Sequence, residues 1–135
     1  MKLKKSLANL IEWERICRVG TVSKTGMPHV VPVCHVVDRG KIYFASENDA
    51  LKIRHLRANP QLALTVDLYS DAWSNLKGVM VQGPTKLIGK GPRFRRIRNL
   101  LYRKYPQYPH YSAIGDADSV IVELTPKQAF SWGVE

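Results

Sequence analysis

The sequence predicts a mainly β protein in which a few helices flank one antiparallel barrel. Short runs rich in β-branched residues recur along the chain, and turn signals at Ser23–Gly26 and Asp38–Lys41 separate the first of them. These runs do not alternate regularly with helices, which favours antiparallel pairing over a parallel α/β sheet. At 135 residues the chain is long enough for one core, so we expect a single domain over residues 1–135.

Six strands follow from the apolar runs between these breaks. The expected strands are Ile16–Ser23, Pro28–Val37, Lys41–Ala45, Leu62–Tyr69, Gly78–Ile88 and Ser119–Leu124. Gly83-Pro84 is expected to bend or bulge the fifth strand.

Three helices are expected beside the strands. They run from Leu7 to about Arg15, from about Asp49 to Asn59 and from about Arg93 to Tyr105. Ser6 is the expected cap of the first helix, and Asn48 or Asp49 that of the second. In the third helix, Phe94, Ile97 and Leu101 form a stripe that should face the barrel.

The long run Pro28–Val37 is apolar on both faces. Pro28, Val30, Pro32, Cys34 and Val36 would lie on one face, and His29, Val31, Val33, His35 and Val37 on the other. We therefore expect a strand buried twice, inside the barrel and under a ligand or second subunit, rather than a half-exposed edge strand. The two prolines lack ladder donors, which suggests that the sheet parts here and leaves backbone groups for another partner.

Ser46, Asn48 and Lys52 lie where a strand passes into a helix. Free backbone N–H groups and one cation converge at such a junction, and this arrangement suits a phosphate. An ordinary capped helix with solvated lysines has the same pattern, so the residues alone leave both interpretations open.

Several segments resemble the pyridoxamine 5′-phosphate oxidase-like flavin-binding split-barrel family. They read GTVSKTGMPHVVPV, KIYFASE, LKIRHLRANPQLALTVD and VQGPTKLI, with a weaker likeness in VIVELTPKQAFSWG near the end. Members of that family use FMN or the deazaflavin F420. The resemblance implies a six-stranded antiparallel split barrel, a homodimer and a flavin bound at the dimer interface.

The resemblance also implies where the cofactor binds. It places the phosphate-binding lysine at Lys52. The relatives carry serine and arginine just before that lysine, whereas this chain has Ala50 and Leu51, so fewer groups would hold the phosphate. Residues expected around the flavin are His29, Val30, Val31, Pro32, Val33, Ala45, Ser46, Lys52, Gln82 and Trp132. For His29 and Trp132, a role in the interior or in closing the core is the alternative.

Other catalytic chemistries have little support in the sequence. There is no Gly-x-Ser-x-Gly motif, and most of the 11 carboxylates fall in turns or in the first helix. His29 and His35 share a strand face but would lie about 20 Å apart, so no metal site is expected. Cys17 and Cys34 form neither a disulfide framework nor a metal-ligand spacing. A flavoprotein fits a sequence that has few candidate catalytic side chains, because the flavin ring itself carries the electrons.

The net charge of +10 predicts attraction to anions. Its densest part is the run Arg93–Lys104, which would suit nucleic acid, although a solvated helix face is the expectation. A polyglutamate tail of F420 is another anion that this run could hold. Haem handling, which also occurs in the resembled family, is compatible with the histidines.

The partners and location expected from the sequence are those of a cytoplasmic enzyme. The N-terminal MKLKKSLANLIEWER begins like a signal peptide, but Asn9, Glu12 and Glu14 interrupt its apolar part. We therefore expect a cytoplasmic homodimer that does not bind a membrane and that acts on a small molecule. The expected activity is that of an FMN-binding oxidoreductase, with F420 as the alternative cofactor.

Overall fold

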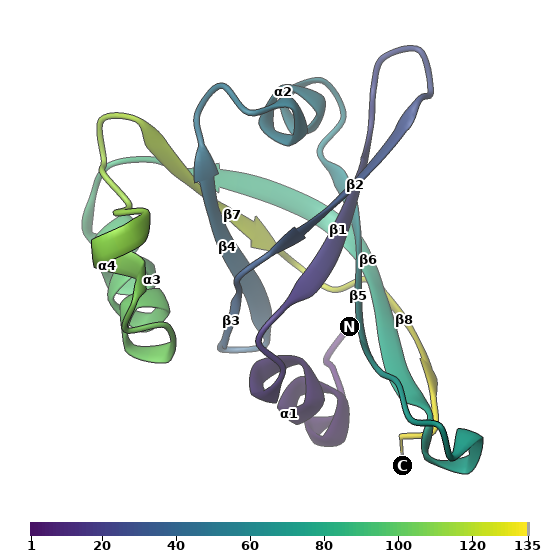
Figure 1. Ribbon diagram of the computed structural model, residues 1–135. Coiled ribbons are helices and arrows are strands. Elements are labelled where there is room, and N and C mark those ends of the chain that lie inside the picture. Colours follow the sequence, from purple (N-terminus) through teal and green to yellow (C-terminus); the bar gives the residue numbers. More distant parts are fainter. Residues whose placement is uncertain (135) are drawn as a thin grey trace.

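The computed structural model describes residues 1–134, within which eight antiparallel strands form one curled sheet with helices around it (Figure 1). The strands are β1 (Cys17–Val22), β2 (Pro28–Val33), β3 (Val36–Asp38), β4 (Lys41–Glu47), β5 (Gln61–Leu68), β6 (Lys77–Ile88), β7 (Ser119–Leu124) and β8 (Gln128–Trp132). The helices are α1 (Lys5–Trp13), α2 (Leu51–Ala58), α3 (Pro92–Lys104) and α4 (Tyr108–Tyr111), with a 3₁₀ turn η1 (Trp73–Asn75). The prediction of a mainly β fold with flanking helices is confirmed.

The long strand β6 joins the two halves of the sheet. Strand order is β2-β1-β5-β6-β7-β4-β3, and β8 pairs with β6 outside this path. The first part of β6, Lys77 to Pro84, pairs with β5, while Thr85 to Ile88 pair with β7. The strand thus changes partner at Gly83-Pro84, where the sequence predicted a bend. The sheet curls into a half-barrel, and α2 lies above the gap between β2 and β4 (Figure 1).

The strand count differs from the expected six for two reasons. The run Pro28–Val37 divides into β2 and β3, and the closing segment forms the additional strand β8. The division occurs at His35, whose backbone N–H and C=O both hydrogen-bond the hydroxyl of Tyr105, each at 3.0 Å. A side chain from 70 positions away thus takes the peptide groups that a continuous strand would pair.

The expectation that Pro28–Val37 is buried on both faces is wrong for the single chain. β2 is an edge strand that pairs only with β1. On its inner face, His29, Val31 and Val33 are half-buried, whereas Val30 on the outer face is 67% exposed. An apolar face therefore remains uncovered where the sequence predicted a ligand or a second subunit.

The helices bury the stripes that periodicity predicted. In α1, Leu7, Leu10 and Ile11 are buried, and α3 buries all three predicted residues of its stripe. The predicted caps are wrong: Ser6 lies inside α1, and neither α1 nor α2 has a side-chain cap.

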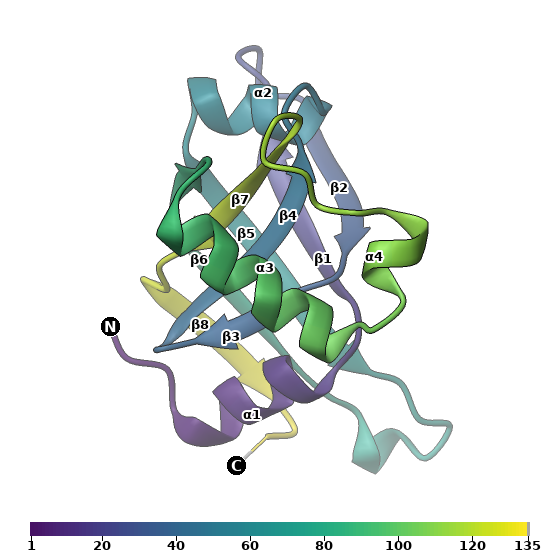
Figure 2. The same cartoon turned by 90° about the vertical axis from the view of Figure 1, so that its left-hand side faces the viewer.

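Two apolar clusters lie on opposite sides of β4 and β7. The larger cluster includes Ile42, Phe44 and Val122 from these strands, packed with α1, α2 and the other half of the sheet. The smaller cluster lies under α3, which crosses the outer side of β4 and β7 (Figure 2). No helix of the described residues is long and apolar enough to cross a membrane.

The point at which β6 changes from pairing with β5 to pairing with β7 generates a prediction about Gly83. A Cβ there would collide with the carbonyl oxygen of Thr125 and would approach the Lys127 nitrogen to 3.2 Å, and both contacts are backbone. We expect Gly83→Ala to lower the free energy of unfolding by about 1–3 kcal/mol, because backbone neighbours relieve overpacking poorly. Gly89→Ala is the matched control, since a Cβ at Gly89 meets no atom within 4 Å. Equal urea midpoints for the two variants would contradict this prediction.

Candidate functional site

A cavity of about 410 Å³ lies between β2, β4, the start of α2 and the segment that contains α4. We call it the β2–β4 cavity. Its lining residues are Ile16, Pro32, Val33, Cys34, Ala45, Lys52, Tyr105, Gln107, Tyr108, Tyr111 and Ser112. Four residues predicted from the sequence to surround a cofactor, Pro32, Val33, Ala45 and Lys52, meet in this one place.

Lys52 is the one cation among the described residues that line this cavity. It belongs to the first turn of α2 and is half-buried. Burial lowers the pKa of the Lys52 ammonium, and the nearby Glu47 carboxylate opposes that shift. A partly desolvated cation at a cavity wall interacts with an anion more strongly than a fully solvated one does.

Three tyrosines from the segment that follows α3 form one wall of the cavity. Tyr105 follows α3, and Tyr108 and Tyr111 begin and end α4. The rings of Tyr105 and Tyr108 meet edge to face, with centroids 6.0 Å apart. Burial raises the pKa of Tyr108 to about 12 and also raises that of Tyr105, so both phenols are neutral at ordinary pH. The wall is therefore aromatic and uncharged, which suits a planar ring.

Sequence reasoning missed these tyrosines as site residues, because YPQYPHY was interpreted only as a loop. Their spacing of three residues after a helix was the available signal. That spacing places all three on one cavity only because the segment folds back as a further short helix, α4.

A buried hydrogen-bond cluster centred on Tyr105 holds the end of the cavity in place. The Tyr105 hydroxyl lies 3.0 Å from the carbonyl oxygens of Arg15 and His35, which share its single proton, and it accepts a hydrogen bond from the His35 N–H. His35 is fully buried, and its Nε2 lies 2.6 Å from the Ile11 carbonyl oxygen. Burial lowers the pKa of His35 to about 4, so the ring is neutral and Nε2–H donates to Ile11. The adjacent lining residues Ile16 and Cys34 are thereby positioned.

The structure does not bring the other predicted residues into the β2–β4 cavity. Ser46 lines a small neighbouring recess, and its hydroxyl donates to the Glu47 carbonyl at 3.1 Å. Val31 packs against the larger core cluster, and Trp132 covers Gly78 from β8.

His29, Val30 and Gln82 line a different cavity of about 590 Å³, which we call the sheet-face cavity. Its other lining residues are Gly20, Thr21, Val22, Pro28, Gln61, Leu62, Ala63, Gly83, Lys127 and Gln128. Val30, Gly20, Ala63 and Gln82 are register partners in a row across four strands. The small residues in the middle of the row create the hollow.

The histidines form no metal centre in this part of the molecule. The rings of His29 and His55 meet edge to face at 5.6 Å, and His55 Nδ1 is 2.9 Å from the Thr21 hydroxyl. Across residues 1–134, no group of three or more His, Cys, Asp or Glu side chains is gathered for a metal ion.

The fold is that of a split-barrel protein, and comparison with known families identifies the family. Residues 3–133 match the family model described as pyridoxamine 5′-phosphate oxidase, and the chain belongs to that family. No curated protein matches the sequence.

Solved structures of the same fold differ in what they bind. A FAD-binding protein from Mesorhizobium loti has a TM-score of 0.77 at 21% identity, covering 96% of this chain and 94% of its own. An F420 reductase has a TM-score of 0.75 at 22% identity, covering 95% and 98%. HutZ, the haem storage protein from Vibrio cholerae, has a TM-score of 0.79 at 15% identity, covering 96% and 94%. At these identities, the likeness establishes the fold alone.

The buried His35 generates a prediction about pH. The pKa is about 4 in the folded chain against 6.5 for an ordinary histidine, so the unfolded state binds more protons between these values. The His35 contribution to stability is therefore complete above pH 6.5 and is lost as the pH falls toward 4, by roughly 3 kcal/mol in all.

Urea unfolding of wild type and His35→Gln at several pH values between 7 and 4 measures this effect. Gln keeps a donor for the Ile11 carbonyl but does not titrate. The free energy of unfolding should fall less steeply with acidification in the variant. Parallel pH profiles would show that His35 does not carry the effect.

Proposed function

We propose that the protein is a flavin-dependent oxidoreductase that binds FMN in the β2–β4 cavity and acts on a small molecule. The observation that carries this proposal is the convergence of Pro32-Val33, Ala45 and Lys52 on one cavity. They come from three separate segments, and the sequence predicts each of them around a flavin. The membership in the pyridoxamine 5′-phosphate oxidase family supports the proposal.

The chemistry of the cavity fits a flavin. Pro32, Val33 and Ala45 offer apolar surface, and the neutral tyrosines offer ring faces, to a flat isoalloxazine ring. The edge of β2 that faces away from β1 has peptide groups without a strand partner, which suit the polar edge of the ring. Lys52 suits the phosphate, and Gln107 and Ser112 are further polar residues of the lining.

A bound flavin would supply the electron-transfer chemistry, while the chain would bind the ring, orient it and exclude water from one face. This division of roles matches the lining. The cavity holds no carboxylate or histidine among the described residues that line it.

F420 is the second candidate, and one observation favours it. Arg93 and Arg96 of α3 pair with carboxylates, but Arg95 and Arg103 are exposed and have no ion-pair partner among the described residues. An acidic tail that extends from the cavity along α3 would find these cations. The nucleic-acid alternative uses the same residues, without accounting for the cavity.

Haem fits the cavity less well than a flavin does. No histidine is among its described lining residues, and burial raises the pKa values of Cys34, Tyr105 and Tyr108. Thiolate or phenolate ligation of iron would have to overcome those shifts.

We further propose that the protein is a homodimer with its flavin near the interface. The outer face of β2 leaves Val30 67% exposed, with Met27 beside the strand 68% exposed. A second copy that covers this face would also cover the sheet-face cavity, so that the predicted residues His29, Val30 and Gln82 would lie at the interface. Exposed apolar surface of this kind is typical of a protein interface.

The dimer proposal predicts the effect of a charge at Val30. Wild type should sediment as a dimer at micromolar concentration, and Val30→Asp should sediment as a monomer because an unpaired carboxylate in an apolar interface is costly. Arg95→Asp is the control: it places the same charge at an exposed position of α3, and this variant should remain dimeric. A monomeric wild type with bound flavin would refute the interface site.

The role of Lys52 is tested by comparing FMN with riboflavin, which lacks the phosphate. We expect Lys52→Ala to weaken FMN binding by about 1.5–3 kcal/mol, the range for a hydrogen bond to a charged group, and to leave riboflavin binding nearly unchanged. Fluorescence titration of the flavin measures both affinities.

The control for this test is Lys90→Ala, which removes an exposed lysine outside the cavity. If wild type binds riboflavin as tightly as FMN, no phosphate site exists at α2. The absorption spectrum of freshly purified protein distinguishes FMN, F420 and haem directly.

A further inference from the structure

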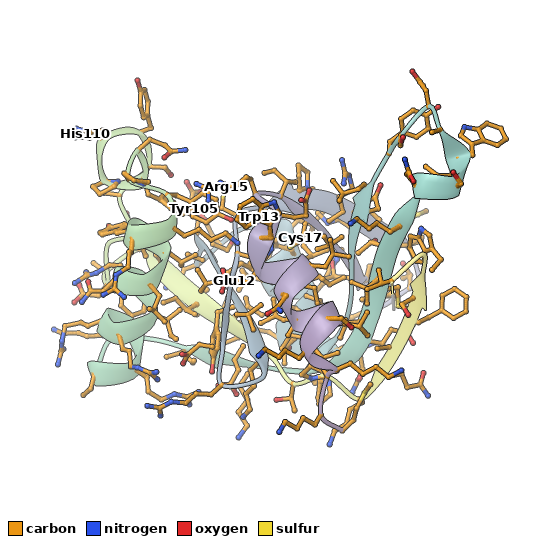
Figure 3. All side chains as sticks on the ribbon, turned by 90° about the horizontal axis from the view of Figure 1, so that it is seen from below. Glu12, Trp13, Arg15, Cys17, Tyr105 and His110 are labelled. Carbon is orange, nitrogen blue, oxygen red and sulfur yellow. The ribbon has the colours of Figure 1, made fainter. Side chains whose placement is uncertain are left out.

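A recess of about 380 Å³ separates the end of α1 from the end of α3, and the flavin proposal does not use it. Its lining residues are Asn9, Glu12, Trp13, Arg15 and Lys104. Figure 3 shows Glu12, Trp13 and Arg15 grouped near Tyr105, between α1 and the α3–α4 segment. None of the ten residues predicted to bind a flavin lines this recess. It lies next to the β2–β4 cavity, because Ile16 and Tyr105, which line that cavity, directly follow Arg15 and Lys104.

The ammonium group of Lys104 is buried and only partly paired. The side chain is 9% exposed, and Nζ lies 3.1 Å from Glu12 Oε1. The Nζ atom makes no well-aligned hydrogen bond to any described residue. The ammonium has three protons and one carboxylate beside it, so its positive charge is only partly compensated. Burial lowers the pKa of this lysine, and the Glu12 carboxylate opposes that shift.

Arg15 adds a second cation to the same wall. Its Nη2 donates to the Lys104 carbonyl at 2.5 Å, and its guanidinium lies 4.9 Å from the centre of the Tyr105 ring. Lys104 Nζ lies 5.4 Å from the same ring centre. Glu12 is the one carboxylate among the lining residues, and its other oxygen accepts the Val37 N–H at 2.9 Å. Two cations against one occupied carboxylate leave the recess with a net positive charge.

Trp13 supplies an exposed aromatic face at the mouth of the recess. Its side chain is 79% exposed although it ends a helix whose buried stripe is Leu7, Leu10 and Ile11. Core packing therefore does not account for an indole at this position. An exposed indole beside cations whose charge is only partly compensated is suited to stacking on a planar ring that carries negative charge.

We propose that this recess binds a planar aromatic molecule that carries one oxyanion group, a carboxylate or a phosphate. The ring stacks on Trp13, the oxyanion accepts hydrogen bonds from the exposed guanidinium of Arg15 beside the positive charge of Lys104, and the Asn9 amide contacts the ring substituents. The guanidinium fork suits either oxyanion, since both present two oxygens to it.

Capping of helix ends explains only part of this arrangement. Arg15 does bond the last carbonyl of α3, and cations near helix C-termini are generally favourable. Capping does not call for an exposed indole, nor for a second, buried ammonium whose charge is only partly compensated. Those two features point to a ligand.

Fluorescence of Trp13 provides the test. In a Trp73→Phe/Trp132→Phe variant, Trp13 is the one tryptophan that remains. Benzoate and phenyl phosphate should each change its emission saturably, and the tighter of the two identifies the preferred oxyanion. Inorganic phosphate, which lacks the ring, and benzyl alcohol, which lacks the charge, should bind at least tenfold more weakly. Calorimetric titration of the unsubstituted chain repeats the comparison, in case the double variant folds poorly.

Two substitutions locate the binding. Arg15→Gln and Trp13→Ala should each weaken binding of the tighter aromatic anion tenfold or more, whereas Arg95→Gln, an exposed arginine elsewhere, should change it less than twofold. The proposal is overturned by any of three results: neither aromatic anion binds saturably, inorganic phosphate binds as tightly as they do, or Arg95→Gln weakens binding as much as Arg15→Gln.

Discussion

The arrangement of the β2–β4 cavity depends on the hydrogen bonds of the Tyr105 hydroxyl. This hydroxyl bonds the backbone of Arg15 and of His35, and so ties the end of α3 to the α1–β1 connection and to the break between β2 and β3. Because His35 also donates to Ile11, the cluster joins α1 to the same point. The bonds of His35 are buried and the bond to Arg15 is part-buried, and a buried polar group without its partner costs more than the bond contributes. The cluster therefore specifies one position for each segment that it joins.

This constraint places the β2–β4 cavity next to the recess beside Trp13. One side of the Tyr105 segment lines the β2–β4 cavity together with Lys52 and the other tyrosines. The neighbouring residues Arg15 and Lys104 line the recess beside Trp13, and both stack over the Tyr105 ring. The first surface is mostly aromatic and apolar, while the second is cationic. One short stretch of chain thus lines two hollows of different chemistry.

Local patterns predicted much of the fold but not how its parts meet. The stripe Phe94, Ile97 and Leu101 was correct because helical periodicity is a property of neighbouring residues. Lys52, Pro32 and Val33 were expected to lie together and do line one cavity. His29 and Gln82 were grouped with them as well, but the curl of the sheet puts both on the sheet-face cavity instead. Which face of a curled sheet a residue occupies depends on strand register, which no short segment encodes.

The sequence by itself determined the class of fold, the bounds of β7 and the buried stripes, because strand and helix periodicity and turn residues act locally. Only the tertiary structure decided that the run Pro28–Val37 breaks at His35, since the hydroxyl responsible belongs to a residue 70 positions away. The same holds for the tyrosine wall and for the recess of Arg15 and Lys104. Each is made of segments that meet only when α1 and α3 dock on the sheet, and such long-range contacts leave no local trace in the sequence.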